Sequence, residues 1–205
     1  MAVGEYPTYE QKGLREPLLC QKCETKVSVW EKYGRSVLFS EAGVRYEQDG
    51  ELTWLHNVDY VKFKLFLMSI LWRAGAARGS FWERVQLGHH EEKLRLMLLA
   101  EQPGAPEQYG CLPWRIHHKD IPLNAIIQPT ASRIGTCAGY RFTFAGVFWA
   151  FAVSSHRDPK LTRLLLQSDG RMLLGPKKDI SEARFFREMI QRLVTEQPGA
   201  QIGAP

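Results

Sequence analysis

The sequence predicts an α+β fold: a helical N-terminal half with a small hairpin, an antiparallel β-sheet in the C-terminal half, and a closing C-terminal helix. Three observations lead to this prediction. Residues 60–74 are apolar around most of a helical circumference, which is typical of a helix buried in a core. After Gly110 the apolar residues alternate with polar ones or form short runs, as they do in strands. Residues 181–194 are amphipathic at helical spacing.

Periodic apolar residues predict helices in the N-terminal half. The expected segments are a helix at 24–39, a helix at 60–74, a short helix or turn at 79–85, and a helix at 88–100. Asp59 stands immediately before the second of these and is a suitable N-cap. The last one is acidic at Glu91 and Glu92 and basic at Lys93 and Arg95, which matches the helix dipole.

Strands are predicted from shorter apolar runs that are separated by turn residues. Residues 44–47 and 52–55 flank an Asp-Gly pair, which favours a hairpin because glycine adopts positive φ at low cost. In the second half the expected strands are 111–116, 123–128, 140–153, and 161–167 with 171–174. The run 148–153 is almost entirely apolar, so we expect it at the centre of the sheet. A Ser-Asp-Gly sequence is expected to form the hairpin turn before residue 171.

Length and composition limit the class of protein. The chain has 205 residues, and we expect an N-terminal zinc-knuckle-like segment with its helix at 1–40, an α+β domain at 41–195 and a flexible tail at 196–205. With 44% hydrophobic and 24% charged residues, the composition is that of an ordinary globular protein. No signal-peptide pattern and no apolar run of transmembrane length is present, so we expect a cytoplasmic protein without a membrane partner.

The charge is mildly basic. The net charge is +5, and residues 157–187 hold eight basic residues against four acidic ones. Such a segment could contact the phosphates of a nucleic acid, and a solvated basic face is the alternative. The sequence contains no dinucleotide-binding glycine motif, no P-loop, no nucleophile-elbow serine and no kinase signature, so these enzyme classes are not expected.

The chemistry is concentrated in a cysteine pair. Cys20 and Cys23 stand directly before the first expected helix and form half of a zinc knuckle. A structural zinc takes four ligands in a tetrahedron, so zinc is the implied cofactor and two ligands are missing. His117 and His118 lie between two expected strands and are the best candidates for them. The alternatives are a buried thiol pair or a remnant for the cysteines, and a polar turn for the histidines.

The other cysteines and histidines carry weaker patterns. Cys111 and Cys137 are expected simply to be buried, since four cysteines in a chain of this size do not make a disulfide framework. His89 and His90 open a helix, but Leu94 stands where the two-histidine zinc face of a metalloprotease needs its second ligand. A solvated helix start is therefore expected there.

Three segments carry a resemblance to a known family. They are QKGLREPLLCQKCE at 11–24, VDYVKFKLFLMSILWRA at 58–74 and LGHHEEKLR at 87–95. Together they resemble an uncharacterised bacterial and phage family whose longer members are similar to HNH endonucleases. Those members begin with another CxxC and a Ser-His-Ile-Ile-Pro segment, and only Cys20 and Cys23 carry over here, as the second knuckle. Glu24 also stands where many HNH enzymes have His or Asn, so the resemblance implies an HNH-associated protein that does not cut DNA alone.

Three hypotheses follow for the function. The first is a non-catalytic module, related to HNH-like proteins, that binds nucleic acid or a protein and has an incomplete zinc knuckle. The second is a metal-dependent HNH-like endonuclease that completes its site with His117 and His118 or with a second chain in a homodimer. The third is a structural protein that assembles through its apolar helix at 60–74 and exposed tryptophans.

Overall fold

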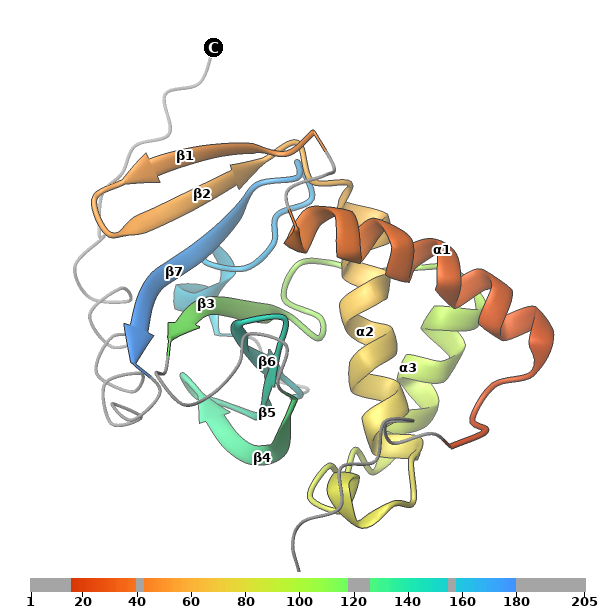
Figure 1. Ribbon diagram of the computed structural model, residues 1–205. Coiled ribbons are helices and arrows are strands. Elements are labelled where there is room, and N and C mark those ends of the chain that lie inside the picture. The colour runs from red at the N-terminus through yellow and green to blue at the C-terminus, as the bar shows by residue number, and fades with distance from the viewer. Residues whose placement is uncertain (1–15, 40–42, 118–125, 155–157, 180–205) are drawn as a thin grey trace, which may run out of the picture.

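The computed structural model describes residues 16–39, 43–117, 126–154 and 158–179. These residues form an α+β structure in which three helices cover one face of a seven-stranded sheet (Figure 1). The helices are α1 (Gln21–Leu38), α2 (Tyr60–Ala76), α3 (His89–Leu99), the short α4 (Pro159–Thr162) and the single turn η1 (Ser80–Trp82). The strands are β1 (Arg45–Asp49), β2 (Leu52–His56), β3 (Cys111–His117), β4 (Ile127–Ile134), β5 (Cys137–Phe144), β6 (Val147–Ala152) and β7 (Met172–Asp179). The predicted α+β class is confirmed.

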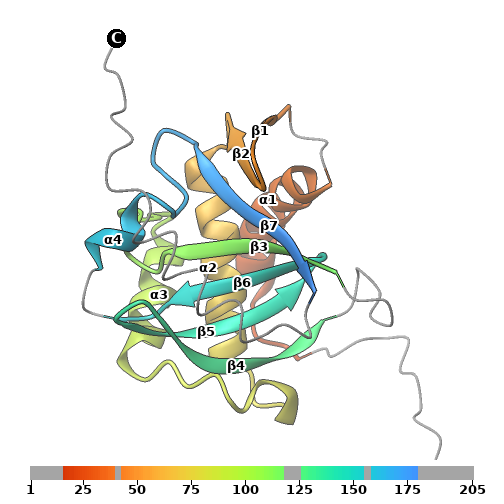
Figure 2. The ribbon, with the colours of Figure 1, turned by 90° about the vertical axis from the view of Figure 1, so that its left-hand side faces the viewer.

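The sheet is mixed, whereas an antiparallel sheet was expected. Its strand order is β1-β2-β7-β3-β6-β5-β4, so β7 lies between the β1–β2 hairpin and the remaining strands (Figure 2). β7 pairs antiparallel with β2 and parallel with β3, and the other described pairs are antiparallel. The predicted antiparallel arrangement is therefore wrong for the β3–β7 pair. The cause is the path of the chain after β6. β7 does not pair with β6 but lies on the other side of β3, where it runs parallel to β3.

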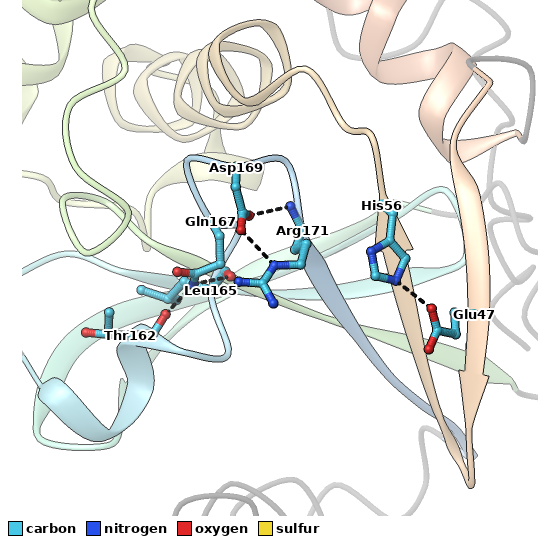
Figure 3. Close-up of polar contacts among 7 residues, drawn as sticks. All are labelled: Glu47, His56, Thr162, Leu165, Gln167, Asp169 and Arg171. Carbon is cyan, nitrogen blue, oxygen red and sulfur yellow. Dashed lines mark hydrogen bonds and ion pairs between the residues drawn. The ribbon is translucent and has the colours of Figure 1, made fainter. Parts of the chain in front are cut away.

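The predicted strand at 161–167 is wrong. Asp158 caps α4 by accepting a hydrogen bond from the Lys160 N–H, with Pro159 in the first turn, and turns follow as far as residue 170. The side-chain amide of Gln167 closes these turns by donating to the carbonyl oxygens of Thr162 and Leu165, at 2.6 and 2.8 Å (Figure 3). The buried leucines of this segment therefore reach the sheet from a short helix and turns, not from a strand.

Element boundaries differ from the prediction at several further places. The expected strand at 140–153 is two strands, β5 and β6, which are separated by Ala145 and Gly146, both with positive φ. β4 begins at Ile127, and residues 123–125 of the expected strand lie outside the described residues. α1 begins at Gln21, before the expected start at residue 24, so Cys23 lies inside the helix. The closing helix at 181–194 and the tail at 196–205 also lie outside the described residues.

The interior strand β6, which lies between β3 and β5, packs into two apolar clusters. Every residue of β6 is buried, as expected for a strand with neighbours on both sides. Trp149 and Phe151 belong to the cluster formed with α1, α2 and α3, while Phe148 and Ala150 belong to the cluster that contains the leucines at and after α4. Because successive side chains of a strand alternate between faces, the two clusters lie on opposite faces of the sheet.

The N-terminus of α2 is capped by Asp59, as predicted. One side-chain oxygen of Asp59 accepts a hydrogen bond from the Lys62 N–H at 3.0 Å, and the other pairs with the Lys62 ammonium at 2.8 Å. Replacing Asp59 by alanine should lower the free energy of unfolding by about 1 kcal/mol, because a first-turn N–H loses its partner. Asp59→Asn keeps the capping oxygen and should lose less in the same urea titration. Equal losses in both variants would show that the ion pair, not the cap, carries the effect.

Candidate functional site at the start of α1

Cys20 and Cys23 lie at the N-terminal end of α1. Cys20 is the N-cap residue, with extended backbone (φ −76°, ψ 161°), and its carbonyl accepts the first helical hydrogen bond, from the Glu24 N–H at 2.9 Å. Cys23 follows one turn later, so both thiols lie on the same side of the helix start. Cys20 is exposed, Cys23 is half-buried, and neither is in a disulfide. The sequence therefore places two thiols together at a helix N-terminus and not in a separate knuckle ahead of it.

The two thiols differ in acidity. The side chain of Cys20 makes no capping hydrogen bond. Interactions with the backbone N–H and the thiol of Cys23 lower the pKa of Cys20. The same thiol–thiol hydrogen bond, with some burial, raises the pKa of Cys23, against the opposing charges of Lys26 and Lys22. Cys20 is thus the thiol that ionises first, and Cys23 keeps its proton to higher pH.

A small cavity opens beside the thiols, between α1, α2 and α3. Its volume is about 240 Å³. The apolar part of its wall consists of Leu18, Leu19, Val27, Trp30, Trp72, Leu98 and Leu99. Its polar part consists of both cysteines, Ser69, Lys26, Arg73 and Arg95. All three cations pair with carboxylates, Lys26 with Glu101, Arg73 with Glu31 and Arg95 with Glu92, each at 2.7 Å. The cavity therefore offers an apolar surface directly next to two sulfur atoms.

The predicted histidine ligands do not join this site. His117 ends β3, where its backbone pairs with Asp179 of β7, and His118 lies outside the described residues. Figure 1 shows the end of β3 and the start of α1 on opposite sides of the molecule, with α2 between them. Among the described residues, no three side chains of the His, Cys, Asp and Glu types lie close enough to hold a metal ion. The structure thus brings Cys20 and Cys23 together and leaves His117 away from them.

The remaining candidates, His90, Cys111 and Cys137, lie away from the cysteine pair and make contacts within the fold. The His90 ring nitrogen Nδ1 lies 3.1 Å from the hydroxyl of Tyr109, and burial, with the charges of His89 and Lys93, lowers the pKa of His90. Cys111 and Cys137 are buried, as predicted, on β3 and β5.

Sequence reasoning missed a buried lysine. Lys64 lies on α2, is 1% exposed, and donates a hydrogen bond from Nζ to the Pro106 carbonyl at 3.0 Å. Burial lowers its pKa to about 8, although the buried Cys111 thiol and Glu107 oppose that effect. Burial raises the pKa of Cys111 well above its ordinary value. The sequence signal that could have revealed it is the position of Lys64 within segment 60–74, which is apolar around most of its helical circumference.

Within the part of the chain that the structure describes, none of the helices has the length and apolar character needed to span a bilayer. Comparisons of this chain with protein-family models, with curated proteins and with solved structures return no match.

Proposed function

We propose that this chain is a non-catalytic binding module in which Cys20 and Cys23 supply two of the ligands of a zinc ion. One observation carries the proposal: Cys20 at the N-cap and Cys23 one turn later place two thiols on the same side of the helix start, and the interaction with Cys23 lowers the pKa of Cys20. Zinc binds thiolates, so a thiol that ionises readily is a better ligand. The remaining ligands would come from outside the described residues or from a second copy of the chain.

The partner that we propose is a nucleic acid. Support comes from the net charge of +5 and from exposed cations at and after α4, namely Lys160, Arg163 and Lys177. Binding through phosphates releases counterions, so affinity should fall steeply as salt is raised. A protein partner is the alternative, and a chain that shows no salt-dependent affinity for nucleic acid at low ionic strength would favour it.

The metal content of the purified chain tests the zinc site. We expect about one zinc ion per chain if the site is completed within it, and about half of that if two chains share an ion through their cysteine pairs. Cys20→Ser and Cys23→Ser should each lose the zinc, since the hydroxyl group is a much poorer zinc ligand. Cys137→Ser is the matched control and should keep it, because this cysteine is buried on β5. Wild-type protein that contains no zinc after expression in zinc-supplemented medium would overturn the proposal.

The second hypothesis, an HNH-like endonuclease, would need further ligands and a general base. His117 lies at the far end of β3 from the cysteines, so a nuclease built on this pair would need ligands from a second chain or from outside the described residues.

A further inference from the structure

We infer that Cys20 and Cys23 form a dithiol that exchanges reversibly with low-molecular-weight disulfides, with Cys20 as the attacking thiol and Cys23 as the resolving thiol. This activity goes beyond zinc binding and does not require a metal.

The geometry allows the two sulfurs to join. Both cysteines line the same cavity at the start of α1. Side chains three residues apart on a helix have Cβ atoms about 5–6 Å apart, and a disulfide requires about 3.5–4.5 Å, so a small movement is enough. Cys20 can supply this movement because, as the N-cap, it has extended rather than helical backbone. The hydrogen bonds of the helix beyond its first turn need not break.

The two thiols are suited to different steps. Cys20 is exposed, so a disulfide in solution can reach its sulfur directly. Cys23 is half-buried, so it is less accessible for the first attack. The cavity beside the pair gives the apolar part of a small disulfide a place to lie, with Lys26 and Arg95 nearby. Cys111 and Cys137 have no such access because both are buried.

The exchange balances without a further reagent. The Cys20 thiolate attacks one sulfur of a disulfide RSSR, forms a mixed disulfide Cys20–S–SR and releases RS⁻, which takes up a proton. The Cys23 thiol then gives its proton to solvent and attacks the Cys20 sulfur, and the second RS⁻ leaves and is protonated. The dithiol is oxidised to a Cys20–Cys23 disulfide, and RSSR is reduced to two RSH. An excess of RSH reverses both steps.

The experiment uses the full chain, stripped of metal with a chelator and mixed with oxidised glutathione at neutral pH. Mass spectrometry should show wild-type protein that has lost two hydrogen atoms, with the new bond mapped to Cys20 and Cys23. Cys23→Ser should instead accumulate one glutathione on Cys20, because the resolving thiol is absent. Cys20→Ser should react about tenfold more slowly than Cys23→Ser, since its remaining thiol is half-buried and less accessible to the disulfide. Cys137→Ser is the control and should form the internal disulfide at the wild-type rate.

Two results would overturn the inference: wild-type protein that gains no internal disulfide, or Cys20→Ser that reacts as fast as Cys23→Ser. Near-ultraviolet circular dichroism of each variant guards against misfolding, since the tryptophans around the cavity report on local packing. Zinc content is measured on separate samples. A chain that holds no zinc but forms the disulfide would contradict the proposed function alone, and a chain that holds zinc but forms no disulfide would contradict this inference alone.

Discussion

Replacing Gly170 by alanine should lower the free energy of unfolding by about 3–4 kcal/mol. Two effects add. Gly170 has φ of +81°, where a side chain costs about 1–2 kcal/mol. A Cβ at this position would also overlap the carbonyl oxygen of Val58, and backbone atoms cannot turn away as a side chain can. The same glycine accepts a hydrogen bond from the Val58 N–H at 3.1 Å, so the overlap would strain the contact that holds the loop before β7 against the start of α2.

Gly50→Ala is the matched control for this prediction. Gly50 also has positive φ, +58°, in the turn between β1 and β2, but an added Cβ would meet nothing within 4 Å. It should therefore lose only the conformational part, about 1–2 kcal/mol. Urea titrations followed by tryptophan fluorescence would measure both losses. Equal losses for the two variants would show that Val58 does not restrict this position.

Replacing Lys64 by methionine should stabilise the protein at neutral pH by about 2 kcal/mol. The folded-state pKa of Lys64 is about 8, and the unfolded value is about 10.4. Holding the charge in the folded core below pH 8 thus costs about 3 kcal/mol, and the methionine avoids that cost. It loses the hydrogen bond to Pro106, which is worth about 1 kcal/mol.

The pH dependence gives a sharper test. Between pH 8 and about 10.4 the unfolded chain keeps a proton on Lys64 that the folded chain has released, so Lys64 makes the free energy of unfolding rise with pH in this window. The advantage of Lys64→Met should therefore shrink across the window and be lost at its upper end. Cys111 acts in the opposite direction in both proteins because its pKa is raised, so the comparison must be the difference between variant and wild type.

Lys93→Met, at an exposed position of α3, is the control and should change stability by less than about 0.5 kcal/mol at every pH. A constant difference between Lys64→Met and wild type from pH 7 to 10 would show that Lys64 does not titrate in the folded protein.

Local signals predicted much of the fold. The Asp-Gly turn between β1 and β2, the cap at Asp59 and the buried run of β6 each depend on a few neighbouring residues, and all three are confirmed. The predicted strand at 161–167 was wrong because its conformation depends on residues that are distant in the sequence. Its closely spaced leucines can be buried from a strand or from short turns, and the choice depends on the side-chain contacts of Gln167 and on a distant sheet face.

The candidate site was predicted in part. The spacing of Cys20 and Cys23 indicated a pair of ligands, and the structure keeps them together at the start of α1. The position of the cavity beside them could not be predicted, because its walls come from three helices that are distant in sequence. The parallel pairing of β3 with β7 was missed for the same reason: no short-range pattern reports which strand lies next to which.

The position of β7 has a consequence for synthesis of the chain. β2 pairs with β1 and β7, and β3 pairs with β6 and β7, so the two parts of the sheet have no shared hydrogen bonds until β7 is in place. On the ribosome, the β1–β2 hairpin must wait with an unpaired edge until about 120 further residues have been made and released from the exit tunnel. Contacts of such long sequence separation slow folding, and an exposed edge invites pairing with other chains. Nascent chains stalled before Met172 should therefore depend on chaperones far more than the completed protein does.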